Sequence, residues 1–161
     1  MNDKKLLAIL EKNAFADRAE IAKKLNCTVD EVNSAVSRLE KEKVIIGYNA
    51  MVDWDKTKRD YITAMIELKI SPIKGEGFDK VARRVSKYPQ VKSVCLMSGS
   101  YDVLLSIEGK SLTEVALFVS QKLAAMDGVL STATHFVLKK YKDKGINYDV
   151  PEGDTRSIFN I

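Results

Sequence analysis

The stretch VKSVCLMSGSYDVLLSIE (Val91–Glu108) alternates apolar and polar residues on both sides of a central glycine. This alternation predicts two strands, Val91–Ser98 and Tyr101–Glu108, because side chains of a strand point to opposite faces in turn. Val94 and Leu96 then share one face of the first strand. The Gly99–Ser100 pair between the strands predicts a tight turn.

Working outward, the same alternation predicts a strand at Ile62–Ile70 and another that carries Leu130, Thr132, Thr134, Phe136 and Leu138 on one face. Helical spacing of apolar residues predicts a helix over Phe78–Val85 and a second one that starts at Ser111. The order from residue 61 is β-α-β-β-α-β, a ferredoxin-like arrangement. Handedness places both helices on one face of a four-stranded antiparallel sheet. The fold class is therefore α+β, and a second copy of the chain is the expected cover for the other face.

The N-terminal part has helical periodicity throughout. Asp17 with Glu20, and Thr28 with Glu31, are the start signals of two helices that follow a first apolar stripe, and Asn26 is a stop signal between them. A small residue at Ala22, Asn26 four positions later and an apolar anchor at Val32 fit a helix-turn-helix. We expect a unit of three helices here.

The outer face of the third helix carries short polar side chains that can reach base edges and basic ones that can reach phosphates. We expect DNA contacts from Thr28, Asn33, Ser34, Ser37, Arg38 and Lys41. A plain three-helix packing unit with a solvated face is the alternative. The net charge is +4, yet residues 1–60 hold 12 Lys and Arg against 11 Asp and Glu, which does not favour a strong non-specific DNA binder.

A second group of residues fits a small zwitterionic ligand. Asp102 next to the Gly99 turn offers a carboxylate, and Thr132 and Thr134 offer hydroxyls from one face of their strand. The alternative is a structural turn beside threonines chosen for strand propensity.

The composition excludes several other classes. Apolar residues make up 45% of the chain without a run long enough to span a membrane, so we expect a soluble protein. We expect no metal site, no cofactor and no catalytic constellation, because His135 is the single histidine and shares no ligand spacing with Cys27 or Cys95. Two distant cysteines indicate the reducing cytoplasm as the location.

These motifs together resemble the Lrp/AsnC (leucine-responsive, feast/famine) family of transcriptional regulators. The similarity covers about Lys4–Lys140, with the Ser-Gly-x-Tyr-Asp turn and the Gly-Val-x-x-Thr-x-Thr strand as its most specific parts. It implies a winged-helix-like helix-turn-helix domain at residues 1–46, a linker strand or hinge at 47–60 and a ferredoxin-like domain at 61–140. The tail from Tyr141 on has little periodicity, and we expect a C-terminal arm at 141–161. Ile45–Val52 is the part of the linker that is apolar enough for a strand.

The resemblance further implies a sequence-specific regulator that binds operator DNA, forms a homodimer and then an octamer, and responds to an amino acid. The effector site carried over by position comprises Gly99, Tyr101, Asp102, Thr132 and Thr134. Ser34 and Ala35 stand where the family often has arginines, and Ser100 where it is often acidic. Two alternatives are therefore kept: an effector-sensing oligomer with weak or lost DNA binding, and an enzyme resembling siroheme decarboxylases.

Overall fold

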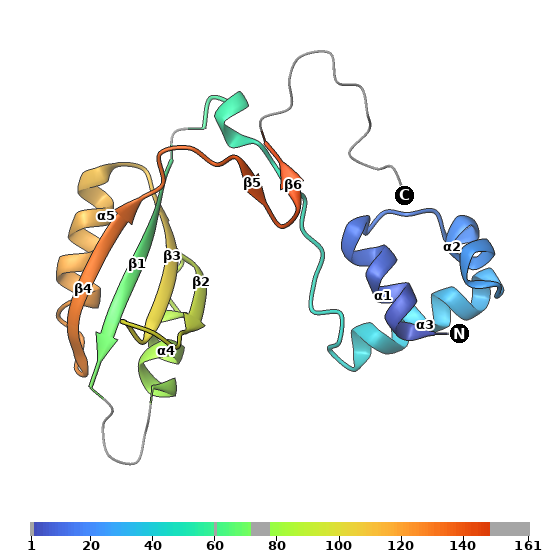
Figure 1. The fold of residues 1–161 in the computed structure, drawn as a ribbon, viewed down its shortest axis with the longest axis horizontal. Coiled ribbons are helices and arrows are strands. Elements are labelled where there is room, and N and C mark those ends of the chain that lie inside the picture. The colour runs from blue at the N-terminus through green and yellow to red at the C-terminus, as the bar shows by residue number, and fades with distance from the viewer. Residues whose placement is uncertain (1, 60, 72–77, 149–161) are drawn as a thin grey trace. The chain divides into compact units, whose positions relative to one another are not determined.

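The computed structural model describes residues 2–59, 61–71 and 78–148 (Figure 1). These residues divide into two compact units. One unit runs up to Val52 and resumes at Lys144, and the other spans Asp53–Asp143.

The first unit consists of three helices, α1 (Asp3–Lys12), α2 (Arg18–Leu25) and α3 (Val29–Lys41). Their apolar stripes meet in a core of Leu6, Leu10, Ile21, Ala22, Val32, Ala35, Val36 and Leu39. The small side chain of Ala22 and the anchor Val32 are both buried there, as a helix-turn-helix requires.

Local signals set the helix ends of this unit. The Asp17 carboxylate accepts hydrogen bonds from the backbone N–H groups of Ala19 and Glu20 and so begins α2. Asn26 ends α2 in the left-handed conformation, with φ of 53°. Thr28 and Glu31 form a complete capping box at the start of α3. Each of these predictions is confirmed.

The second unit contains β1 (Ile62–Ile70), α4 (Asp79–Val85), β2 (Val91–Leu96), β3 (Val103–Gly109), α5 (Leu112–Phe118) and β4 (Val129–Phe136). A wider helical turn, η2 (Val119–Leu123), continues α5. The strands form one antiparallel sheet in the order β2-β3-β1-β4. This is the predicted ferredoxin-like α+β arrangement.

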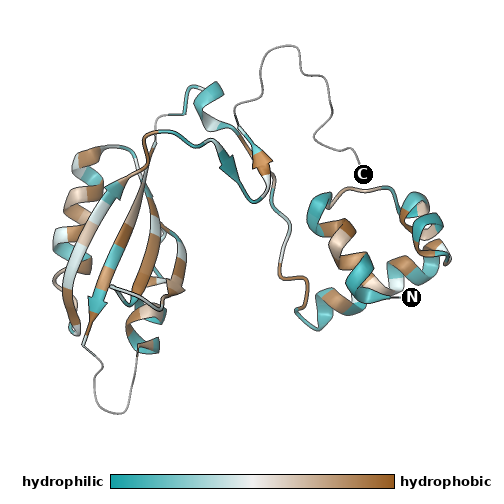
Figure 2. Ribbon diagram, in the orientation of Figure 1, coloured by the Kyte–Doolittle hydropathy of each residue, from teal (hydrophilic) through white to brown (hydrophobic). Residues whose placement is uncertain are grey.

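One face of this sheet is buried and the other is not. Ala64, Ile66, Leu68 and Ile70 of β1 are buried together with Val103, Leu105 and Ile107 of β3, against apolar residues of α4, α5 and η2. The strands in Figure 2 accordingly change between hydrophobic and hydrophilic residues along their length. The opposite face, which we call the bare face, carries Met65 and Glu67 of β1, Leu104 and Ser106 of β3, and Ala133 and His135 of β4, as strand register and alternation place them.

Three expectations about local structure are wrong. Ile45–Val52 forms no strand in this chain, since a strand needs a hydrogen-bonded neighbour; the short helical turn η1 (Trp54–Lys56) follows it. The connection between β2 and β3 is a loop, Met97–Asp102, rather than a two-residue turn. Gly99 has no positive φ there, and a Cβ atom would meet nothing within 4 Å.

The last expectation concerns the face of β4. Thr132, Thr134 and Phe136 do pair with buried residues of β1, but an irregularity in the pairing between Val129 and Ser131 separates Leu130 from them. Leu130 is 69% exposed, and Leu138 lies beyond the strand, 97% exposed. The segment after β4 forms two short paired strands, β5 (Lys142–Asp143) and β6 (Ile146–Asn147), while the rest of the expected arm lies outside the described residues.

Candidate functional site

The exposed side of α3 carries the predicted DNA contacts. Val32, Ala35, Val36 and Leu39 face the core, which turns the opposite side of the helix outward. All six predicted residues are exposed at the N-cap or on this helix: Thr28, Asn33, Ser34, Ser37, Arg38 and Lys41. Asp30 and Glu31 are exposed in the first turn as well. The structure therefore brings the predicted residues onto one surface, which also contains carboxylates.

Arg38 has two acidic partners that we did not predict. Its guanidinium Nη2 lies 2.7 Å from Asp3 Oδ2, and its Nη1 lies 3.2 Å from Glu42 Oε2. The hydrogen bond with Asp3 and its charge raise the pKa of Arg38 above its usual value. A phosphate that binds Arg38 must compete with both carboxylates.

The backbone N–H and the hydroxyl of Thr28 are both engaged in the capping box with Glu31. Its hydroxyl accepts a hydrogen bond from the Glu31 N–H at 3.2 Å and lies 3.1 Å from Glu31 Oε2. The Thr28 N–H donates to the same carboxylate at 2.8 Å, and this backbone bond is the main reason why the pKa of Glu31 is lowered. The start of α3 thus already holds a carboxylate.

Asp102 of the predicted effector site is bound to the neighbouring strand. Its Oδ2 accepts a hydrogen bond of 2.7 Å from the Ile70 N–H, and its own N–H donates to Leu68 O at 2.9 Å. The Asp102 carbonyl oxygen accepts from the Met97 N–H at 2.8 Å, which closes the loop that holds Gly99 and Tyr101. The Asp102 carboxylate therefore extends the pairing between β1 and β3.

Thr132 and Thr134 lie on the other side of β1. They pair with Leu68 and Ile66, and both are half-buried on the face that the helices cover. Since β1 runs between them and Asp102, the two groups are separated by roughly two strand spacings, about 10 Å. Within one chain the predicted effector residues do not converge on a single small pocket.

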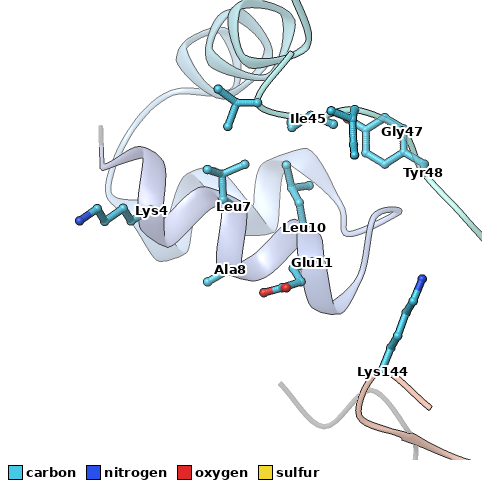
Figure 3. A pocket seen from close by; sticks show the side chains of 11 residues that line it. Lys4, Leu7, Ala8, Leu10, Glu11, Ile45, Gly47, Tyr48 and Lys144 are labelled. Carbon is cyan, nitrogen blue, oxygen red and sulfur yellow. The ribbon is translucent and has the colours of Figure 1, made fainter. Parts of the chain in front are cut away.

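A groove of about 730 Å³ runs along α1 in the first unit (Figure 3). In the figure Leu7 and Leu10 point from α1 toward the segment that holds Ile45, Gly47 and Tyr48. The charged residues in its lining are Lys4, Glu11 and Lys144. Because its lining is mainly apolar and these charges do not form a set of one sign, we assign no ligand to this groove.

His135 lies on the bare face, with its Nε2 3.3 Å from Glu67 Oε1. In the described part of the chain no group of His, Cys, Asp and Glu has the arrangement of a metal site. No helix among these residues is long and apolar enough to cross a membrane.

Two family models match the chain. Residues 63–146 match the Lrp/AsnC ligand binding domain, and residues 2–46 match a winged helix-turn-helix DNA-binding domain. The uncharacterized HTH-type transcriptional regulator YugG of Bacillus subtilis (strain 168) is 47% identical over 156 residues, which cover 96% of this chain and 94% of YugG.

Solved structures agree with this fold. Escherichia coli AsnC matches with a TM-score of 0.68 at 19% identity, over 89% of this chain and 95% of that one. The transcriptional regulator NMB0573 of Neisseria meningitidis, solved as a complex with L-Met, matches with a TM-score of 0.67 at 23% identity, over 91% and 92% of the two chains.

Proposed function

Because the chain belongs to the Lrp/AsnC family of DNA-binding transcriptional regulators, we propose that it recognises a specific operator through α3 and that a free amino acid bound by its C-terminal domain changes its assembly or its DNA affinity. Members of this family are regulators rather than enzymes, so the siroheme-decarboxylase alternative is set aside. We place this activity in the cytoplasm.

The DNA-binding part of the proposal rests on the exposed side of α3. Asn33, Ser34 and Ser37 are short polar residues toward the start and middle of an exposed helix, where base edges of the major groove come within reach. Arg38 and Lys41, near its end, are suited to phosphates. Thr28 contributes by fixing the helix start.

The amino-acid effector is supported by the family model and by a neighbour. The C-terminal domain matches a ligand-binding domain, and NMB0573 was solved with L-Met. We keep Gly99, Tyr101, Asp102, Thr132 and Thr134 as effector-site residues of the assembled protein. Since Asp102 and the threonines lie on opposite sides of β1, an effector that uses both needs an extended shape or a surface completed by another copy.

The bare face supports a homodimer. It is a sheet surface that no described element of the second unit covers, and a second copy supplies an identical surface that fits a two-fold axis. We propose that such dimers assemble further into octamers.

DNA binding is tested by fluorescence anisotropy with the protein's own upstream region and with unrelated DNA. Arg38→Ala should weaken binding to both and lower the salt slope by roughly one phosphate contact per protomer. Asn33→Ala should instead reduce the preference for the operator, by roughly 1–3 kcal/mol at one base position. Equal effects of both variants on both DNAs would contradict this assignment of roles.

One observation favours the second candidate, an effector-sensing oligomer with weak DNA binding. Arg38 is held by Asp3 and Glu42, while Asp30 and Glu31 add negative charge to the same helix. The same titration decides between the candidates, since a sensor of this kind binds its upstream region no better than unrelated DNA.

A further inference from the structure

A pocket of about 650 Å³ lies in the second unit at the end of the sheet where β1 begins and β3 ends. It belongs neither to α3 nor to the loop around Gly99. Its charged and aromatic lining comprises Arg59, Tyr61, Lys92, Glu108, Lys110 and Glu114. These residues come from the segment before β1, from β2, from β3 and the residue after it, and from α5, so the fold gathers them from distant parts of the chain.

Arg59 is positioned by two aromatic rings. Its guanidinium carbon lies 4.3 Å from the centre of the Trp54 ring and 5.2 Å from that of the Tyr61 ring. Burial raises the pKa of Tyr61, in agreement with a packed ring. Rings near a guanidinium restrict its motion and leave the N–H groups at its edge for a carboxylate.

The cations of the pocket retain unused donors. Arg59 Nη2 and Lys92 Nζ lie 3.7 Å and 3.8 Å from the same oxygen, Glu108 Oε2, which is longer than a hydrogen bond. The ammonium of Lys110 forms no ion pair with any residue that the structure describes. Three cations therefore line the pocket. Arg59 and Lys92 share the Glu108 carboxylate as their ion-pair partner.

The pocket also offers acceptors for a cation. Glu114 and Glu108 are half-buried in the lining, and Glu114 Oε2 is fixed by a 2.7 Å hydrogen bond from the Lys110 N–H. The side-chain oxygen of Gln90, which lines the same pocket, is buried without a hydrogen-bond partner in the described residues. A small reorientation toward a ligand ammonium would satisfy this oxygen, which is costly to leave unpaired.

We propose that this pocket binds an acidic α-amino acid of the glutamate or aspartate class. Three cations against two carboxylates leave a charge of +1, which matches the −1 of such a ligand. The two carboxylates of the ligand bind Arg59, Lys92 and Lys110. Its ammonium binds the side-chain oxygens of Glu108, Glu114 and Gln90. This proposal rests on the effector part of the proposed function, to which it adds a second binding site and a ligand class. It does not depend on DNA binding.

The test is calorimetric titration of the full-length protein with three compounds that share one carbon skeleton. L-Glutamate carries all three charges, glutarate lacks the ammonium, and L-glutamine lacks the second carboxylate. Each missing charge should weaken binding about tenfold, since one charge-assisted hydrogen bond is worth about that factor. No heat of binding with L-glutamate at millimolar concentration would overturn the proposal.

Variants locate the ligand. Lys110→Gln and Arg59→Lys should each weaken L-glutamate binding about tenfold, the first by removing a charge and the second by removing the planar guanidinium. Lys87→Gln, an exposed lysine outside the pocket lining, is the matched control and should have no effect. If Asp102→Asn abolishes binding while Lys110→Gln and Arg59→Lys do not weaken it, the ligand lies at the loop and the pocket proposal is wrong, although an amino-acid effector remains. Failure of DNA binding in the anisotropy assay would leave this result unaffected.

Discussion

Arg38 and Asp3 are 35 positions apart in the sequence and 2.7 Å apart in the structure. The aspartate belongs to the first turn of α1, and the arginine to the last turns of α3. The ion pair restricts the orientation of the Arg38 guanidinium. It also places the Asp3 carboxylate where it competes with a phosphate for this guanidinium. A carboxylate outside the helix-turn-helix pair thus competes with the phosphate contact that we propose for Arg38.

Asp3→Asn should therefore strengthen binding to all DNA sequences several-fold and increase the salt slope, because Arg38 becomes available to a phosphate. In an Arg38→Ala background the same change should have little effect, since the competitor then has nothing to compete for. Anisotropy titrations at several salt concentrations measure both quantities. Glu11→Gln, which removes a carboxylate elsewhere on α1, serves as the control. Equal gains in the presence and absence of Arg38 would show a general charge effect.

Asp102 allows its structural and charge roles to be separated. Asp102→Ala leaves the Ile70 N–H without its acceptor and should reduce the free energy of unfolding by roughly 1–3 kcal/mol. Asp102→Asn keeps an acceptor oxygen and should cost clearly less, while it removes the charge that an effector ammonium would use. Chemical denaturation of both variants measures the difference. Equal destabilisation would mean that the charge, rather than the hydrogen bond, holds the loop.

Helix ends were the elements easiest to predict from the sequence. Asp17, Asn26 and the Thr28–Glu31 box act on backbone groups at most four positions away, so residue identity and spacing determine them. Strand positions followed from alternation for the same reason. The form of the loop between β2 and β3 could not be predicted in this way. Asp102 is held there by a hydrogen bond from Ile70, 32 positions earlier, and such a contact leaves no local sequence pattern.

Site residues show the same division between local and distant contacts. The exposed side of α3 could be derived from helical periodicity, whereas the Arg38 partners and the pocket around Arg59 depend on how distant elements pack. The position of Thr132 and Thr134 relative to Asp102 depends on strand order as well, since β1 lies between them. Sequence spacing placed them on suitable elements but could not give the distance between them.

The capping box of α3 predicts a pH dependence. The pKa of Glu31 is lowered in the folded protein, so its ionised form stabilises the fold. This contribution is fully present above the ordinary glutamate pKa and is lost as the pH falls through the lowered value. Glu31→Gln should therefore destabilise the protein near neutral pH, and its deficit should shrink in acid. Thermal unfolding of both proteins across this range tests the sign, and a deficit that is constant with pH would contradict it.

On the scale of the whole molecule, one face of the sheet is covered by no described element of the second unit. Its central row holds Cys95, Leu104, Glu67 and Ala133 on four neighbouring strands, and the next row holds Ser106, Met65 and His135. Within the described residues of the second unit, no element packs on these rows. A two-fold partner would bury the apolar members and bring two Glu67–His135 pairs into the same interface.

Leu104→Glu should therefore break the proposed dimer. Leu104 lies on a central strand of the bare face beside Glu67, so the new carboxylate would be buried next to an existing one. Burial of an unpaired charge should cost roughly 3 kcal/mol or more, which raises the dissociation constant about a hundredfold. Leu117→Glu on α5 is the control, because Leu117 is already 48% exposed on the far side of the sheet's helical layer. Sedimentation velocity over a concentration series measures the outcome. A native protein that stays monomeric, or a Leu104→Glu variant that dimerises as the native protein does, would mean that the bare face is not the interface between copies.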